Sequence, residues 1–558
     1  MFRKYLFVCA AVLFAAISAA AASPFTADPS APVPAVPKDL APAIREINRI
    51  LEKSRCADKL PMIPRASDAV FVRRAYLAIV GRIPKLSETR DFLNSKDPAK
   101  HTKLIDRLLA DEEHADLIAM RFADMLRIKS EFPVNLWPNA VQAFHHRIRT
   151  DIFNNRPYSE MVFEMLTSSG SNFRVPYANF FRGSGDRTPK GLAKITALTF
   201  MGLRTENLPE EKLKKFEALF SRIRFKSSSE WKEEFVFTDP EPAELKVWIP
   251  GVGSRTIESP AEEPRLVLAR ALVSDDNPYF ARAFVNRAWS WFFGKGLIDP
   301  ADDITPERGS WDRFLCGIGL DSPSEREIHP ELLDLLTREF RRSGYDMRTL
   351  FRLILNCRAF HTASVLAPRR NITGEEEKPE AVRARTERLF LTFPVRRIEA
   401  EVISDSIGTL FRSYNKYSSV IPEPFTYLPG GTHAVQIADG SISSGMLDLF
   451  GRPSRDTGKI SERNNNATAA QRLYLLNSNV IYRQISNLAN RTGRSFRGTL
   501  RKNSIEYIYL TVLSRKQTPI EQKWIMDYWQ KLPKKQRWQI WTDLYWSLIN
   551  SKEFLYYH

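Results

Sequence analysis

The sequence has 558 residues, of which 43% are hydrophobic and 26% are charged, and its formal net charge is +17. This length exceeds what one compact core usually holds, so we expect two or three domains. The basic balance favours an acidic partner, either an anionic polysaccharide or an acidic envelope surface. No nucleic-acid-binding motif accompanies it, which argues against nucleic acid as the partner. The alternative that the charge only keeps the protein soluble stays open.

The N-terminus has the pattern of a secretory signal. Arg3 and Lys4 precede an apolar run from Leu6 to Ala22 that ends in small residues. These features predict a signal peptide over 1–22 with cleavage near Ser23, which removes two positive charges and lowers the net charge from +17 to +15. No later stretch has about 18 uninterrupted apolar residues, so no membrane span is expected after cleavage. The sequence therefore predicts a secreted or periplasmic protein.

The first half of the chain is predicted to be mainly helical. A proline-rich leader over 23–45 is expected to be extended. Helical periodicity follows at 68–79, 103–109, 115–128, 141–153, 189–201 and 209–220, which predicts an N-terminal helical domain over 46–230. Between 231 and 258 the runs EEFVFTD, ELKVWIP and SRTIE are short, extended and separated by prolines and glycines. They predict a small β insertion at 231–258.

The second half, 259–558, is predicted to be another helical domain, so the fold class is a mainly α, multi-helical two-domain body. Helices are expected at 263–273, 277–296, 330–342, 346–360 and 395–411. Near the C-terminus, Thr518 and Glu521 form a capping-box pattern around Pro519.

The stretch Met446–Ser478 joins a polar turn to a strongly periodic segment. Ala469, Leu473, Leu476 and Val480 recur at three- and four-residue steps, and Leu475 and Ile481 widen this stripe. The pattern predicts a helix that buries one face. Thr468 or the asparagines at 464–466 are expected to cap it.

The turn before this helix is rich in arginine. Arg452, Arg455 and Arg463 lie close to Asp456, and Gly451 and Gly458 favour an irregular backbone. A guanidinium group suits planar anionic partners, so two outcomes are open. Either the arginines pair with carboxylates and carbonyls of the protein itself, or Arg452, Arg455, Asp456 and Arg463 line a ligand-binding cleft.

Catalytic patterns are weak. The histidines show no HExxH spacing and the serines no GxSxG spacing, so neither a metal site nor a serine hydrolase is predicted. Asp302 and Asp303 form the best local carboxylate pair for glycoside hydrolysis, although capping or a salt bridge to Arg308 also explains them. His329 precedes Pro330 and is expected to cap a helix, and it is a further weak catalytic candidate.

Three cysteines remain after removal of the predicted signal: Cys56, Cys316 and Cys357. Their spacing does not match a metal site, and the odd number leaves at least one thiol unpaired. A bridge between Cys316 and Cys357 is one alternative. The other is that Cys357 packs inside an apolar helix.

Long segments of the chain resemble a known pair of domains of unknown function. Phe71 to Leu93 and His145 to Val162 resemble a planctomycete-type cytochrome-like domain, and Asn277 to Ile304, His329 to Leu355, Arg396 to Ile407, Met446 to Ser478 and Trp546 to Phe554 resemble a planctomycete-specific domain. Many relatives have a cysteine-histidine motif where this chain has FMGLRTENLPEEKLKKFEALF, from Phe200 to Phe220. Covalent haem attachment needs CxxCH, which is absent from the sequence, so we expect neither haem nor another cofactor.

The resemblance implies an exported protein that works beside secreted sulfatase-like or polysaccharide-processing proteins, and it brings no established catalytic residues. The leading hypothesis is a protein that binds or organises an anionic glycan or a cell-envelope partner. The alternatives are a polysaccharide-acting hydrolase that uses a carboxylate pair and a structural subunit of an envelope complex.

Overall fold

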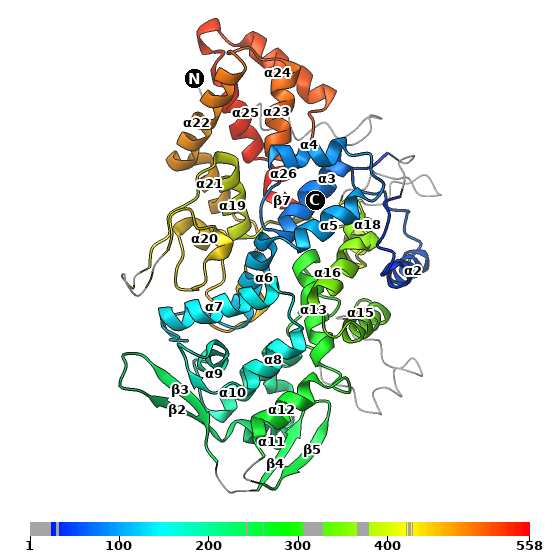
Figure 1. Cartoon of the computed structure of the whole chain (residues 1–558). Helices are drawn as coiled ribbons and strands as arrows, with labels where there is room; N and C mark the ends of the chain where they lie inside the picture. Colours follow the sequence, from blue (N-terminus) through cyan, green and yellow to red (C-terminus); the bar gives the residue numbers. More distant parts are fainter. Residues whose placement is uncertain are drawn as a thin grey trace.

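The computed structural model describes residues 24–28, 33–240, 244–259, 262–304, 327–364, 379–419, 421, 426 and 428–558. The fold is mainly α-helical, as predicted, and its sheets have two or three short strands (Figure 1). The predicted signal peptide at 1–22, the cleavage position near Ser23, Arg308 and the Cys316 end of the suggested bridge lie outside the described residues. Cys357 is buried and Cys56 is exposed.

The N-terminal part consists of a series of helices. They are α2 (Ala41–Ala57), α3 (Asp68–Ile79), α4 (Leu86–Asn94), α5 (Lys100–Leu109), α6 (Glu112–Met125), α7 (Pro138–Phe153) and α8 (Tyr158–Thr167). Sequence signals fix several of their starts: the Ser67 hydroxyl accepts a hydrogen bond from Val70 N before α3, and α7 begins at Pro138. The leader was predicted to extend to residue 45, but α2 already begins at Ala41. Ile44, Ile47, Ile50 and Leu51 recur at helical spacing and form the buried face of this helix.

Shorter elements lead into the β region. They are η1 (Pro176–Ala178), α9 (Asn179–Arg182), α10 (Pro189–Thr196), a π-helical segment η2 (Ala197–Met201), η3 (Thr205–Asn207), α11 (Glu210–Glu217) and η4 (Ala218–Phe220). The segment from Phe200 to Phe220 therefore contains the end of the π-helical segment and three short helices.

The β region is longer than predicted and forms two sheets. One has the order β1-β3-β2, with β1 (Gly170–Ser171), β2 (Ile223–Ser227) and β3 (Glu234–Thr238), and the other is the hairpin β4 (Leu245–Ile249) and β5 (Gly253–Ile257). The predicted insertion at 231–258 missed β2. This strand is recognisable only by its pairing with β3, from Ile223 opposite Thr238 to Ser227 opposite Glu234.

The C-terminal part is again helical. Its elements are α12 (Pro264–Val273), α13 (Phe280–Phe293), α15 (Pro330–Arg342), α16 (Met347–Asn356), α17 (Arg358–His361), α18 (Pro379–Arg388), β6 (Arg396–Arg397), α19 (Ala400–Phe411), η5 (Ala434–Gln436), α20 (Gly445–Leu449), η6 (Ile460–Glu462), α21 (Ala469–Asn477), α22 (Asn479–Ser495), α23 (Lys502–Leu513), α24 (Pro519–Lys531), η7 (Lys534–Gln536), α25 (Gln539–Ile549), α26 (Lys552–Leu555) and β7 (Tyr556–Tyr557). The predicted capping boxes at Thr518 and, for α21, at Thr468 are present. No helix among the described residues has both the length and the apolar character needed to cross a membrane.

The two halves share their packing. One cluster of buried apolar side chains includes residues from Ile44 to Tyr557, and α2 packs on α15, α5 on α16 and α4 on α23. In α3, Arg73 donates to the carbonyl oxygens of Val512 and Phe554 at 2.8 and 3.0 Å. The division into 46–230, 231–258 and 259–558 stays a prediction.

The prediction for the helix after the arginine-rich turn is partly wrong. Leu473, Leu476 and Val480 were expected to be buried, but they are 57%, 41% and 52% exposed. Leu475 and Ile481, which widen the predicted stripe, are buried as expected. The single predicted helix is two helices, since α21 ends at Asn477 and α22 starts after Ser478, so the helical period does not continue from one to the other. Part of the predicted apolar stripe is therefore exposed to solvent.

Candidate functional site

The arginine-rich turn lies between α20 and α21. Gly451 begins it with φ of 81°, and Arg455 also has a positive φ, of 60°. A Cβ at Gly451 would lie 1.9 Å from the carbonyl oxygen of Asn464, so only glycine allows the two ends of the turn to approach this closely.

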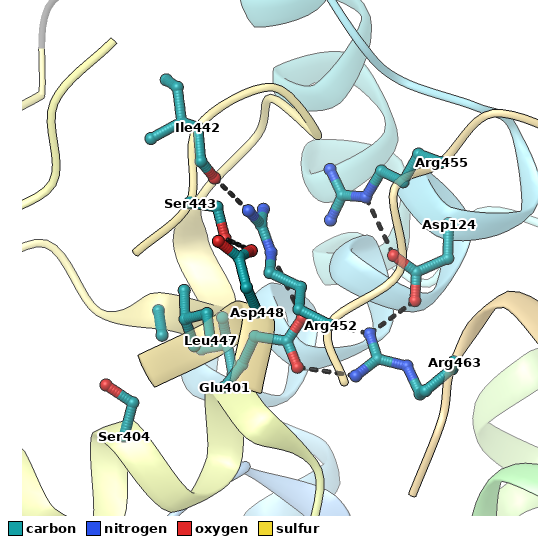
Figure 2. Close-up of polar contacts among 12 residues, drawn as sticks. Asp124, Glu401, Ser404, Ile442, Ser443, Leu447, Asp448, Arg452, Arg455 and Arg463 are labelled. Carbon is teal, nitrogen blue, oxygen red and sulfur yellow. Dashed lines mark hydrogen bonds and ion pairs between the residues drawn. The ribbon is translucent and has the colours of Figure 1, made fainter. Parts of the chain in front are cut away.

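The guanidinium groups of the turn contact two carboxylates from different helices, of which Glu401 is fully buried and Asp124 is partly buried (Figure 2). Asp124 of α6 accepts from Arg455 Nε at 2.9 Å and from Arg463 Nη2 at 2.6 Å. Glu401 of α19 accepts from Arg463 Nη1 at 2.6 Å, and its other oxygen lies 3.4 Å from Arg452 Nε. Arg463 therefore bridges the two carboxylates.

Backbone carbonyls complete the contacts. Arg452 donates to the carbonyl oxygens of Ile442 and Asp439, and Arg455 donates to that of Ala438 at 2.6 Å. Asp456, at the edge of the network, pairs with Lys129 at 2.7 Å. The network thus ties α6, α19 and the loop before α20 to one turn.

Charge pairing keeps both carboxylates ionised. Burial raises the pKa of Glu401, but Arg463 and Arg452 outweigh this effect and leave its pKa below the usual value. The pKa of Asp124 is lowered in the same way: burial opposes the shift, and Arg463 and Arg455 produce it. Burial lowers the pKa of Arg452 to about 10. The opposite charges therefore stabilise one another where burial penalises each of them alone.

The geometry matches the first of the two outcomes that the sequence left open, in which the arginines pair inside the protein. Arg455 is fully buried, and the Arg452 and Arg463 side chains are 2% and 9% exposed. Most of their donors point at Asp124, Glu401 and carbonyl oxygens, so these contacts connect the turn to α6 and α19. Ligand binding by Arg452, Arg455, Asp456 or Arg463 gains no support from this arrangement.

The carboxylate pair Asp302 and Asp303 is also buried. Asp302 accepts from the backbone N–H of Ile460 at 2.9 Å, and the two carboxylates lie 3.6 and 3.5 Å from the guanidinium group of Arg204. Asp303 also accepts from Asn207 at 3.3 Å. The two carboxylates therefore connect the loop after α13 to η3 and to η6. These contacts explain their burial by a structural role.

His329 lies apart from these carboxylates. It occupies the N-cap position of α15, but its side chain does not cap the helix, contrary to the prediction. Its ring nitrogens instead contact Leu389 O at 3.0 Å and Ser54 Oγ at 3.3 Å. Burial lowers the pKa of His329 and so favours the neutral ring. The described part of the chain has no group of three or more His, Cys, Asp or Glu side chains suited to a metal ion.

An open groove, which we call the α22 groove, lies between α22 and the end of α19. Its volume is about 420 Å³, and its lining residues are Phe411, Ser413, Gln484, Asn487, Asn490, Arg491 and Arg494. Gln484, Asn487, Arg491 and Arg494 recur at three- and four-residue steps, so the helix presents them on one side. Arg491 donates to the carbonyl oxygen of Phe411 at 3.4 Å. The groove thus combines amide and guanidinium groups.

The α22 groove was not predicted from the sequence, although a sequence signal marks it. From Arg463 to Ile505 the chain has eight basic residues and no Asp or Glu. The arginines at 491 and 494 therefore have no carboxylate nearby in sequence, unlike Arg455, which precedes Asp456. A search for long segments without acidic residues would have separated these arginines from the internally paired ones.

Comparison with family models matches most of the chain. Residues 46–218 match PSCyt2, described as a protein of unknown function (DUF1549), and residues 264–315 and 317–529 match PSD1, described as a protein of unknown function (DUF1553). The chain belongs to this paired-domain family. The segment between the two matched regions of this paired-domain protein contains β2 to β5. No curated protein and no solved structure matches it significantly.

Proposed function

We propose that this paired-domain protein binds an anionic glycan in the α22 groove. The observation that carries the proposal is the lining of the groove, where side-chain amides lie beside two arginines in a segment without acidic residues. An amide both donates and accepts hydrogen bonds, as a sugar hydroxyl does. A guanidinium group binds a carboxylate or sulfate through two parallel hydrogen bonds. The groove therefore offers partners for both parts of an acidic sugar.

The arginines of the groove differ from those of the turn. Arg452, Arg455 and Arg463 have carboxylate partners inside the protein. Arg491 and Arg494 are exposed, and the described residues provide no ion-pair partner for either. An anionic ligand supplies that partner. The predicted export and the positive net charge support the same ligand class. Secreted sulfatase-like or polysaccharide-processing proteins, which the family resemblance suggests as partners, act on polymers of this kind.

Calorimetric titration of the full chain tests the proposal. The probes are an oligogalacturonate, a sulfated galactan oligosaccharide, and the methyl ester of the first, which lacks its charges. We expect binding of at least one anionic probe and none of the ester. Arg491→Gln with Arg494→Gln should weaken binding by about tenfold or more, since each lost charged hydrogen bond is worth about 1.5–3 kcal/mol.

A matched control uses the same helix and the following turn. Arg483→Gln with Arg497→Gln removes the same charge from exposed positions that do not line the α22 groove. We expect this variant to bind nearly as the unmodified protein does. Equal losses in both variants would show unspecific charge attraction, and absence of binding to both anionic probes would reject the glycan. Either result overturns the proposal.

A further inference from the structure

The polar side chains of the α22 groove form two groups along the helix. Gln484, Asn487 and Asn490 supply amide groups to its N-terminal part. Arg491 and Arg494 supply guanidinium groups to its C-terminal part. Because a helix rises about 1.5 Å per residue, the lining extends over about 15 Å, of which the amides take about 9 Å. The groove therefore has a neutral end and a cationic end.

The protein itself does not use the amides of the neutral end. Asn487 and Asn490 are exposed and Gln484 is half-buried, and none of the three side chains has a hydrogen-bond partner within the described part of the chain. Asn286, by contrast, donates to the carbonyl oxygen of Ile298 at 2.9 Å in the interior. The amides of the groove therefore keep both donors and acceptors available for sugar hydroxyl groups.

The second wall of the groove meets α22 at the cationic end. Arg491 donates to the carbonyl oxygen of Phe411, the last residue of α19, at 3.4 Å. Phe411 and Ser413 are the lining residues that do not belong to α22. An anionic group at this end therefore lies between α22 and the end of α19. The amide end is formed by α22, which runs along the outer edge of the molecule in Figure 1, so a longer chain has room to continue there.

We infer that the ligand of the α22 groove is an oligosaccharide segment with one acidic sugar at its end, followed by neutral sugars. The inference rests on the proposed glycan function and adds the chemical class of the glycan. The acidic sugar pairs with Arg491 and Arg494, and the hydroxyl groups of the neutral sugars bind Gln484 and Asn487. A uniformly charged polymer matches the groove less well, because its charges at the amide end meet no counter-charge.

Ligand-observed nuclear magnetic resonance titration of the full chain tests the inference, because it also measures weak binding. The probes are glucuronic acid, a neutral xylo-oligosaccharide, and the same xylo-oligosaccharide with one glucuronic acid at its end. The charged oligosaccharide should bind at least about tenfold more tightly than glucuronic acid, since two added neutral hydrogen bonds together account for roughly this factor. This gain should persist at high ionic strength, where attraction between exposed charges is screened.

Two variants separate the ends of the groove. Gln484→Ala with Asn487→Ala should lower the affinity for the charged oligosaccharide to about that for glucuronic acid. Arg491→Gln with Arg494→Gln should lower it to about that for the neutral oligosaccharide. Circular dichroism melting shows that each variant is folded.

The matched control is Asn503→Ala with Gln530→Ala, which removes one exposed amide from α23 and one from α24 and should bind as the unmodified protein does. The inference is overturned if the charged oligosaccharide binds no better than glucuronic acid. It is also overturned if the amide variant weakens both acidic probes by the same factor, since amides and arginines then hold the same sugar. The glycan proposal survives either result. If neither acidic probe binds, the inference fails, and the oligogalacturonate and sulfated galactan titrations show whether the glycan proposal fails with it.

Discussion

Glu401 and Asp124 are the residues on which the arginine-rich turn depends. They lie on different helices, α19 and α6, and Arg463 contacts both. Removal of either carboxylate leaves at least one guanidinium group buried without its counter-charge, which costs more than the pair contributes in total. The contacts explain how charged side chains of an irregular turn can be buried.

At the residue scale we predict that Glu401→Gln destabilises the protein by about 3–5 kcal/mol at neutral pH, because it leaves buried guanidinium charge unpaired. The pKa of Glu401 is lowered in the folded protein, so its contribution to stability is present above about pH 4 and is lost as pH falls through the folded pKa. The difference between the two proteins should therefore shrink in acid. Urea unfolding between neutral and acidic pH measures both effects.

Asp448→Asn provides the control for this substitution. Asp448 is exposed and accepts a hydrogen bond from Ser443. Its replacement should change the free energy of unfolding by less than about 0.5 kcal/mol. A Glu401→Gln protein as stable as this control at neutral pH would contradict the role given to the buried network.

At the element scale, the turn between α20 and α21 depends on the backbone of Gly451. Its φ is 81°, and a Cβ added there would approach Asn464 O to 1.9 Å, so the position excludes a side chain. Gly451→Ala should lower the free energy of unfolding by at least about 2 kcal/mol, from backbone strain and steric overlap. Thermal and urea unfolding measure the change.

Gly430→Ala is the matched control, since a Cβ at Gly430 meets nothing within 4 Å. Its effect should stay within about 0.5 kcal/mol. If Gly451→Ala proves as mild as Gly430→Ala, then the turn can adopt another backbone path.

At the scale of the whole molecule, the C-terminus is attached to α3. Arg74 is buried and donates to the carbonyl oxygens of Thr362 and His558 at 2.9 and 3.0 Å, and Arg73 reaches Val512 and Phe554. These contacts join residues that are hundreds of positions apart. Together with the shared apolar cluster, they connect the two matched family regions.

We therefore predict that the whole chain unfolds in one cooperative transition, with equal calorimetric and van't Hoff enthalpies. Arg74→Met should lower its midpoint and cost about 3 kcal/mol, because buried carbonyl oxygens lose a charged donor. The exposed Arg90→Met is the control. Two separate transitions in calorimetry, with only one shifted by Arg74→Met, would contradict this prediction.

Local signals in the sequence were sufficient to predict many of the helices. Thr518, Pro519 and Glu521 marked the start of α24, because a capping box involves only neighbouring residues. The sequence also predicted most of the helices from their periodicity, and it showed the family resemblance and the absence of a CxxCH motif. The strand at Ile223–Ser227 was not, because its partner at Glu234–Thr238 determines its conformation.

The sequence by itself determined the mainly helical class, the family and the lack of a haem-attachment motif, since these depend on residue order over short distances. Only the tertiary structure decided which arginines are paired and which side of α21 is buried. Periodicity groups Leu473, Leu476 and Val480 on one face but does not say what that face meets. Likewise, Arg455 and Arg491 are chemically identical, and they differ because Asp124 approaches only Arg455 from a distant helix.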